Sequence, residues 1–256
     1  FNPAIMWPTN NGTPIALDFF AYYPYNDNSG TEQVACDLAK GISITGANLG
    51  TTIGDQTDYL VAPVVADQTV QASAVGVAFE HISSLLLFSA QDITQINELK
   101  NKVTVNSITI KNVSTSGDYA NTAAGDVAGT WTAGAAGDLP KITLDASVAT
   151  TAAELTTTTS NPVLVIPTTL TAATQTVDIV YSIAAYNYGG EDFPAQNNIT
   201  ASFDLKAGTI VAWEQGKKYV YTIKFNLTEE LEIKFAPTVE NWTEGGATDL
   251  IVDKML

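Results

Sequence analysis

The chain has 256 residues, a formal net charge of −16 and a sequence pI of about 4.1. Such an acidic surface repels phosphate backbones, so nucleic acid is excluded as a partner. Hydrophobic residues make up 45% of the chain and charged residues only 15%, which indicates a globular protein with a largely uncharged polar surface. Cys36 is the single cysteine, so no internal disulfide can form and the fold must depend on its core.

The polar residues have an unusual composition, with no Arg and much Thr. All eleven basic residues are Lys and none is Arg. An extracellular chain exposed to an Arg-specific protease would have a reason to lose every Arg, and compositional drift in an acidic surface protein explains the same feature equally well. Thr supplies about one residue in eight, and its branched side chain suits the exposed face of a strand without adding charge.

Short runs with period-two alternation, separated by Gly, Asn, Asp and Pro, predict an all-β fold. The predicted strands, in chain order, cover residues 15–23, 59–66, 75–90, 105–113, 163–166, 177–188, 199–205, 219–227 and 231–235. Pro63 interrupts the second run, which we therefore expect to be an edge strand or a bent strand. Residues 75–90 form the longest apolar run, predicted to be a central strand that bends or continues into a second sheet.

Only one short segment has helical spacing. Ile93, Ile96 and Leu99 recur at helical intervals, and Asp92 stands where the N-cap of a helix would stand. The sequence therefore predicts one or two helical turns at the surface within residues 92–102.

The domain organisation follows from the spacing of the predicted strands. About ten strands with turn signals every 10 to 20 residues favour a β-sandwich architecture. Residues 120–136 and 146–160 are rich in Ala, Gly and Thr, and we expect them to form long loops or irregular edges. We place the boundary before the longest apolar run, which gives an N-terminal β domain at 1–70 and a C-terminal β-sandwich domain at 71–256.

A search for catalytic or metal-binding residues finds no constellation. His81 is the only histidine, and its apolar neighbours favour a structural role beside a core strand over that of a general base. Cys36 has no histidine near it in sequence and is predicted to be a small buried residue. Glu229, Glu230 and Glu232 are interpreted as a solvated face and not as the paired carboxylates of a glycosidase. We predict no catalytic, cofactor-binding or metal-binding residue, and a protein that is not an enzyme.

Aromatic residues cluster in one short stretch near the N-terminus. Because alternate side chains of a strand point to opposite faces, this cluster can divide between the core and a carbohydrate-binding surface, and core packing is the favoured interpretation. The cluster comprises Phe19, Phe20, Tyr22, Tyr23 and Tyr25.

Five segments spread over most of the chain carry motifs that occur together, in the same order, in one family. They are Trp7-Pro8 with residues 17–24 (LDFFAYYP), 58–62 (DYLVA), 77–85 (VAFEHISSL), 213–221 (WEQGKKYVY) and 239–242 (VENW). In this order they resemble the fimbrillin and Mfa-like pilus subunits of Bacteroidales.

The resemblance implies two transthyretin-like β-sandwich domains in tandem and a structural pilus subunit or pilus-associated adhesin. It also implies export as a lipoprotein to the cell surface, in a pilus anchored at the outer membrane. In such a pilus an Arg-specific protease removes an N-terminal strand, and a strand from the next subunit fills the vacated groove. The implied partners are other pilus subunits, with a host protein or glycan as a further ligand.

Two features leave alternatives open. In the family several strands precede the WP motif, so here either the N-terminal domain is cut short or the chain is a compact variant. The stretch 249–256 (DLIVDKML) suits either a donor strand or an ordinary last strand.

The alternative function is a surface lipoprotein that binds carbohydrate through exposed Tyr and Trp residues without polymerising. A flat row of exposed aromatic rings would favour that function, whereas an open apolar groove at a sheet edge would favour assembly.

Overall fold

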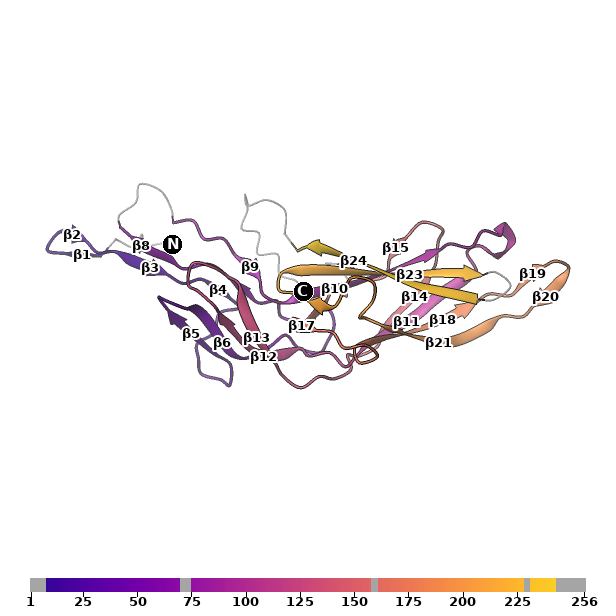
Figure 1. Ribbon diagram of the computed structural model, residues 1–256, viewed down its shortest axis with the longest axis horizontal. Coiled ribbons are helices and arrows are strands. Elements are labelled where there is room, and N and C mark those ends of the chain that lie inside the picture. The colour runs from indigo at the N-terminus through magenta and orange to yellow at the C-terminus, as the bar shows by residue number, and fades with distance from the viewer. Residues whose placement is uncertain (1–7, 70–74, 158–160, 228–230, 243–256) are drawn as a thin grey trace. The chain divides into compact units, whose positions relative to one another are not determined.

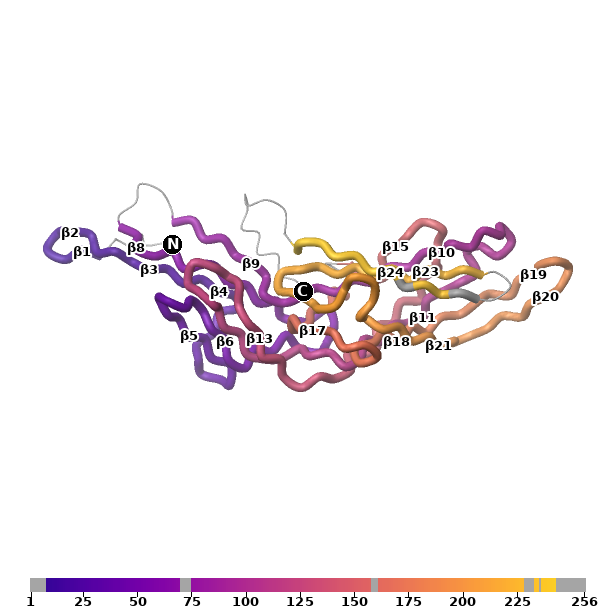
Figure 2. Tube along the Cα trace, viewed as in Figure 1, coloured from indigo at the N-terminus to yellow at the C-terminus, as the bar shows by residue number. Residues whose placement is uncertain are grey.

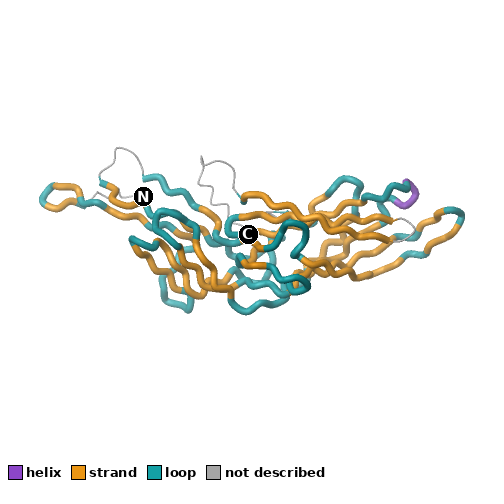
Figure 3. Tube along the Cα trace, in the orientation of Figure 1, coloured by secondary structure: helices purple, strands orange, loops and turns teal. Residues whose placement is uncertain are grey.

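The structure is a computed structural model that describes residues 8–69, 75–157, 161–227 and 231–242. Within these ranges nearly all regular structure is strand, and Figure 3 shows one short helix, the 3-10 helix η1 (Asn97–Leu99). The predicted all-β class with little helix is thus confirmed. No helix of the described chain has the length and hydrophobicity required to cross a lipid bilayer.

The chain forms two compact units, and each of them is discontinuous in sequence. Unit 1 comprises Phe1–Ala47, Asp58–Ile82 and Asp118–Thr132, whereas unit 2 comprises Asn48–Thr57, Ser83–Gly117 and Ala133–Leu256. These units do not follow the division into 1–70 and 71–256 that the sequence suggested. The physical reason is that strand pairing between distant segments, and not chain order, decides which segments share a core.

Unit 1 contains a four-stranded sheet with the strand order β13-β12-β6-β5 (Figure 1). Its strands are β5 (Gln33–Asp37), β6 (Gly41–Asn48), β12 (Ser116–Asn121) and β13 (Gly129–Ala133). None of the four was predicted, because Gly, Ser, Thr and Asp occupy many of their positions and hide the alternation. In β5, for example, Val34 is the one buried residue.

The remaining strands of unit 1 are short and belong to three small sheets. The pairs are β1 (Thr9–Asn10) with β2 (Thr13–Pro14), β3 (Leu17–Phe19) with β8 (Val65–Gln68), and β7 (Leu60–Val61) with both β4 (Tyr22–Tyr23) and β9 (Glu80–His81). The predicted strand 15–23 is broken between β3 and β4. The predicted strand 59–66 is broken at Pro63, which cannot donate a hydrogen bond to a sheet ladder.

Unit 2 is built around β10 (Ser84–Asp92), the central strand of its first sheet. The other strands of this sheet are β15 (Ala153–Glu154), β16 (Val163–Val165), β23 (Lys217–Leu227) and β24 (Leu231–Asn241). Strands β10 and β23 are far apart in sequence but pair in parallel. Figure 2 shows the purple trace of β10 close to the orange trace of β23. Residues 75–79 have no regular structure, and the run 75–90 passes from β9 into β10, which confirms that it continues into a second sheet.

The second sheet of unit 2 is antiparallel, with the order β14-β11-β18-β21. Its strands are β11 (Val103–Lys111), β14 (Ile142–Ser147), β18 (Thr176–Ile183) and β21 (Gln196–Asp204). Beyond β18 the chain forms the hairpin of β19 (Tyr186–Tyr188) and β20 (Glu191–Phe193), and a separate pair joins β17 (Thr168–Thr169) to β22 (Ala212–Trp213). The low-complexity residues 120–136 and 146–160 contribute the edge strand β13 and the short strand β15.

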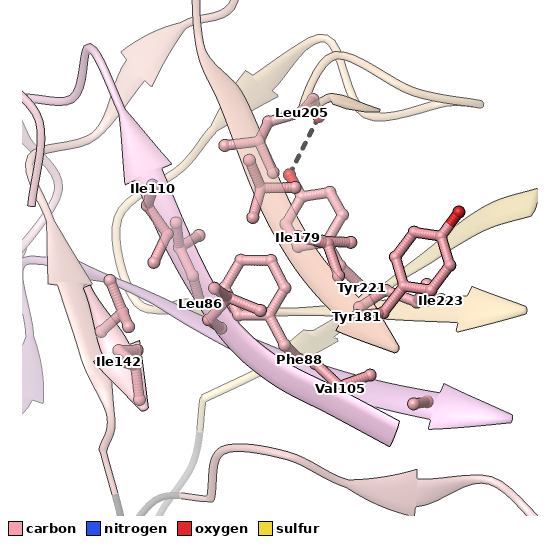
Figure 4. Packing of buried hydrophobic residues seen from close by; sticks show 14 of the residues in the cluster. Leu86, Phe88, Val105, Ile110, Ile142, Ile179, Tyr181, Leu205, Tyr221 and Ile223 are labelled. Carbon is pink, nitrogen blue, oxygen red and sulfur yellow. Dashed lines mark hydrogen bonds between the residues drawn. The ribbon is translucent and has the colours of Figure 1, made fainter. Parts of the chain in front are cut away.

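The core of unit 2 is formed by the alternating apolar rows of its two sheets. Strand β18 shows the pattern most clearly, since Val177, Ile179, Tyr181 and Ile183 are buried and the residues between them are not. Figure 4 shows side chains of this core, including a hydrogen bond from the Tyr221 hydroxyl to the Leu205 carbonyl, which measures 3.0 Å. The same hydroxyl accepts a hydrogen bond of 2.9 Å from Trp213 Nε1, and burial raises the pKa of Tyr221.

The predicted helix at 92–102 is limited to η1, and Asp92 does not cap an α-helix. The Asp92 side chain is buried, with 2% of its surface exposed. One carboxylate oxygen accepts the Thr94 N–H at 2.9 Å and the other accepts the Asn101 N–H at 2.6 Å. Asp92 therefore fixes the loop between β10 and β11 through two backbone groups.

Removal of the buried Tyr221 hydroxyl tests the importance of its hydrogen bonds. We expect Tyr221→Phe to lower the free energy of unfolding by about 1–3 kcal/mol, because a buried donor and a buried acceptor lose their partner. Urea denaturation followed by fluorescence measures the change. Tyr181→Phe is the matched control, since the described residues supply no hydrogen bond to that hydroxyl. An equal loss in both variants would show that the hydrogen bonds of Tyr221 contribute nothing specific.

Candidate functional site

His81, the only histidine, lies in β9 and pairs with one carboxylate. Its Nδ1 lies 2.5 Å from Asp58 Oδ2, and the two side chains are 11% and 10% exposed. Within the described ranges no three His, Cys, Asp or Glu side chains gather as metal ligands would. The pair joins β9 to the segment that precedes β7, so the arrangement serves to position these short strands.

Of the other residues singled out from the sequence, the structure describes Cys36 in unit 1 and Glu232 in unit 2. Cys36 is exposed, so its predicted burial is wrong; it lies near the end of the edge strand β5, where little covers it. Glu229 and Glu230 lie outside the described residues. Glu232 lies in β24, opposite Asn226 of β23.

The aromatic cluster of unit 1 is only partly packed. Phe19, Phe20 and Tyr22 are half-buried, whereas Tyr23 is 46% exposed and Tyr25 is 84% exposed. The favoured interpretation of core packing is therefore wrong for Tyr23 and Tyr25. Strand β4 has only two residues, so it provides too little sheet to cover both faces.

The edge strands of unit 2 have core-facing rows that are incompletely covered. In β23 the core-facing residues Tyr219 and Phe225 are 2% and 0% exposed, but their partner Val239 on β24 is 45% exposed and Ile233 is half-buried. Strand β21 behaves in the same way, since Phe203 is half-buried although it pairs with a buried residue of β18. In the described part of the chain, no strand pairs with the outer edge of β24 or of β21.

Unit 1 has a small buried core for its length. Its buried hydrophobic residues among those described are Val34, Ile42, Ile44, Ala47, Tyr59, Val61, Ala62, Ile82, Tyr119 and Val127. Ile15, just before β3, is 42% exposed, and Val77 and Phe79, just before β9, are each 38% exposed. Apolar side chains that a complete sandwich would cover are thus open to solvent beside the short strands of this unit.

All of these features would favour the addition of a further strand to the sheets. An edge strand offers unpaired N–H and C=O groups, and an uncovered apolar row offers pockets for alternate side chains of an incoming segment. The fold therefore defines a class of protein: an all-β protein of two sandwich-like units whose sheet edges and open apolar rows suit strand addition.

Comparison with known proteins identifies the family of the chain. The family model described as fimbrillin-like matches residues 1–242, and the chain belongs to this family. No curated protein sequence matches it.

Several solved structures share the fold. A fimbrial protein from Bacteroides vulgatus is 17% identical with a TM-score of 0.61, and the match covers 88% of this chain and 77% of that one. A candidate cell adhesion protein from Bacteroides uniformis is 22% identical with a TM-score of 0.51, covering 89% and 73%. Another from Parabacteroides distasonis is 10% identical with a TM-score of 0.52, covering 83% and 78%. At these identities the likeness extends to the fold alone.

The open apolar residues of unit 1 should matter little for the stability of the isolated chain. We expect the double variant Val77→Ser, Phe79→Ser to change the free energy of unfolding by less than about 1 kcal/mol, because both side chains already contact water. Ile44→Ala, at a site only 1% exposed, should cost about 2–5 kcal/mol. Urea denaturation of both variants checks this, and a loss in the double variant as large as that in Ile44→Ala would show that the two residues belong to the core.

Proposed function

We propose that this protein is a subunit of a surface pilus, or an adhesin carried by one, that joins its neighbours by donor-strand exchange. In this process an extended segment of one subunit adds to a sheet of the next and buries its side chains there. Membership of the fimbrillin-like family supports the pilus or adhesin role. The strand-exchange step has separate support from the small core and the half-exposed apolar residues of unit 1.

The observation that carries the proposal is the small core of unit 1 beside half-exposed apolar residues. Val77 and Phe79 lie two residues apart in the irregular segment just before β9, and Ile15 lies just before β3. Full burial of such a side chain is worth about 2 kcal/mol relative to full exposure, so covering the part still exposed, 38% to 42% of each, gains roughly 1 kcal/mol per residue. An added strand that covered them would also pair its main chain with an unpaired edge of the short strands of unit 1. Hydrophobic burial and hydrogen bonding would thus both favour the addition of a strand.

The partners in this proposal are other pilus subunits, because the added strand comes from a neighbouring chain. Residues 249–256, which lie outside the described residues, are the candidate donor segment. We further propose lipoprotein export and a pilus anchored at the outer membrane, with a host protein or glycan as ligand. The absence of Arg supports maturation by an Arg-specific protease, since the mature subunit would offer that protease no site.

A second candidate function is glycan binding by a surface protein that does not polymerise. Exposed aromatic rings favour it in each unit. Tyr23 and Tyr25 are exposed in unit 1, and in unit 2 the rings of Tyr186 and Phe193 stack on the β19–β20 hairpin with centroids 4.7 Å apart. Such rings offer an apolar platform beside polar groups, as many small-molecule sites do.

Heat-dependent gel mobility tests the strand-exchange proposal. The sheared cell-surface fraction is run in SDS without and with boiling and detected by immunoblot. We expect a ladder of multimers that collapses to one band on boiling, because a donated strand is held by many hydrogen bonds and a buried apolar row. A single monomer band under both conditions would contradict polymerisation and favour glycan binding.

The double variant Val77→Ser, Phe79→Ser locates the acceptor. We expect it to shorten or abolish the ladder while the amount of protein at the surface is unchanged. Tyr25→Ser is the matched control, since it removes a large exposed side chain of the same unit that lies outside the strands. A full ladder from the double variant would place the acceptor elsewhere.

A further inference from the structure

In unit 2 the strand β16 pairs with β10 along one edge. Along its other edge the main chain of β16 is hydrogen-bonded to the side-chain carboxamide of one residue. The Leu164 N–H donates to Gln56 Oε1 at 2.7 Å, and Gln56 Nε2 donates to the Leu164 carbonyl at 2.8 Å. Gln56 Nε2 also donates to the Gly50 carbonyl at 2.9 Å, and the residue is only 7% exposed. Toward Leu164 the carboxamide presents one N–H donor and its C=O acceptor in one plane, so it occupies the place that the peptide group of a further strand would take.

In unit 1 the edge strand β5 has the same arrangement. The Val34 N–H donates to Asn28 Oδ1 at 2.7 Å, and Asn28 Nδ2 donates to the Val34 carbonyl at 3.0 Å. Val34 pairs with Ile44 of β6 in the register of the antiparallel ladder. Residues of such a ladder alternate between those bonded to the partner strand and those whose groups point outward. Val34 therefore belongs to the outward set, and so does Cys36, two residues further on.

The loop before β5 holds Asn28 in place. Its backbone is in the left-handed region, with φ 56°, and its N–H donates to Asn26 Oδ1 at 2.6 Å. Gln33 Nε2 in turn donates to the Asn28 carbonyl at 3.1 Å. Asparagine tolerates this backbone conformation better than most residues, which allows a carboxamide to stand at the edge.

We propose that Asn28 is a strand-edge cap, which closes β5 at Val34 against pairing with the edge of another copy of this chain. Gln56 completes the hydrogen bonds of β16 in the same way inside unit 2, where Gln56 and Leu164 are only 7% and 0% exposed. An incoming strand would have to displace both hydrogen bonds of a cap before it gained its own. Pairing between copies is thereby disfavoured at Val34 of β5. The proposal holds whether or not the protein polymerises, because uncapped edges associate in any β protein.

The single cysteine provides a reporter for the β5 edge. Asn28→Gly removes the carboxamide and keeps the backbone, because Gly adopts a positive φ without strain. Asn11→Gly is the matched control, since it makes the same change at φ 50° in the exposed β1–β2 turn. Purified chains are treated with a short bifunctional maleimide, which joins two copies where their Cys36 side chains come close, and dimers are read on a boiled SDS gel.

We expect Asn28→Gly to give several-fold more cross-linked dimer than the parent chain or Asn11→Gly, and none in the Cys36→Ser background. Far-UV circular dichroism and the urea midpoint establish that each variant is folded. A folded Asn28→Gly that cross-links no more than the parent would overturn the proposal, and so would a parent chain that cross-links as readily as the variant.

Amide hydrogen exchange tests the cap in the unmodified chain, where no variant has to fold. The Val34 and Cys36 amides both point away from β6, but only that of Val34 meets a cap. We expect the Val34 N–H to exchange many-fold more slowly than the Cys36 N–H, and the Leu164 N–H to be protected as well. Equal exchange at Val34 and Cys36 would show that the Asn28 carboxamide does not occupy the edge.

Discussion

Every sheet of this protein must end, and each edge strand leaves main-chain N–H and C=O groups that need partners. The chain meets this requirement in different ways at different edges. On β5 and β16 a side-chain carboxamide takes the position of a neighbouring peptide group. On β24, Pro237 removes one donor from an otherwise long strand. Which edges remain open to another strand therefore follows from how the chain completes its own hydrogen bonds.

The interior of unit 2 depends on β10, which is enclosed on both sides. One side pairs in parallel with β23. The other pairs with β16 and β15, and between them Thr156 Oγ1 accepts the Phe88 N–H at 2.9 Å. Because both edges are satisfied, the strand can be apolar on both faces without inviting association. The same apolar sequence at an edge would be an aggregation site.

The sequence predicted the parts of the fold in which hydrophobic alternation is strong. Strands β11, β18 and β23 were found because their core-facing residues are large and apolar. Strands β5, β12 and β13 were missed because few of their residues are buried, and β6 was missed because Gly, Ser and Thr between its buried residues mask the period. The caps were beyond sequence reasoning, since Gln56 meets Leu164 across 108 residues of chain and no local pattern marks that pairing. The exposure of Cys36 likewise depends on its place at the end of an edge strand.

The interleaving of the two units has a consequence for how the chain is made. Unit 1 cannot be completed when its first segment emerges, because β12 and β13 arrive only after the whole of β10 and β11 of unit 2. Until then β6 lacks a neighbour on one side and the apolar residues of the first segment stay uncovered. Contacts this distant in sequence slow the search for the native state. Unit 1 therefore stays open to premature pairing until residue 132 has been made, and neither unit can be produced as a simple N-terminal or C-terminal fragment.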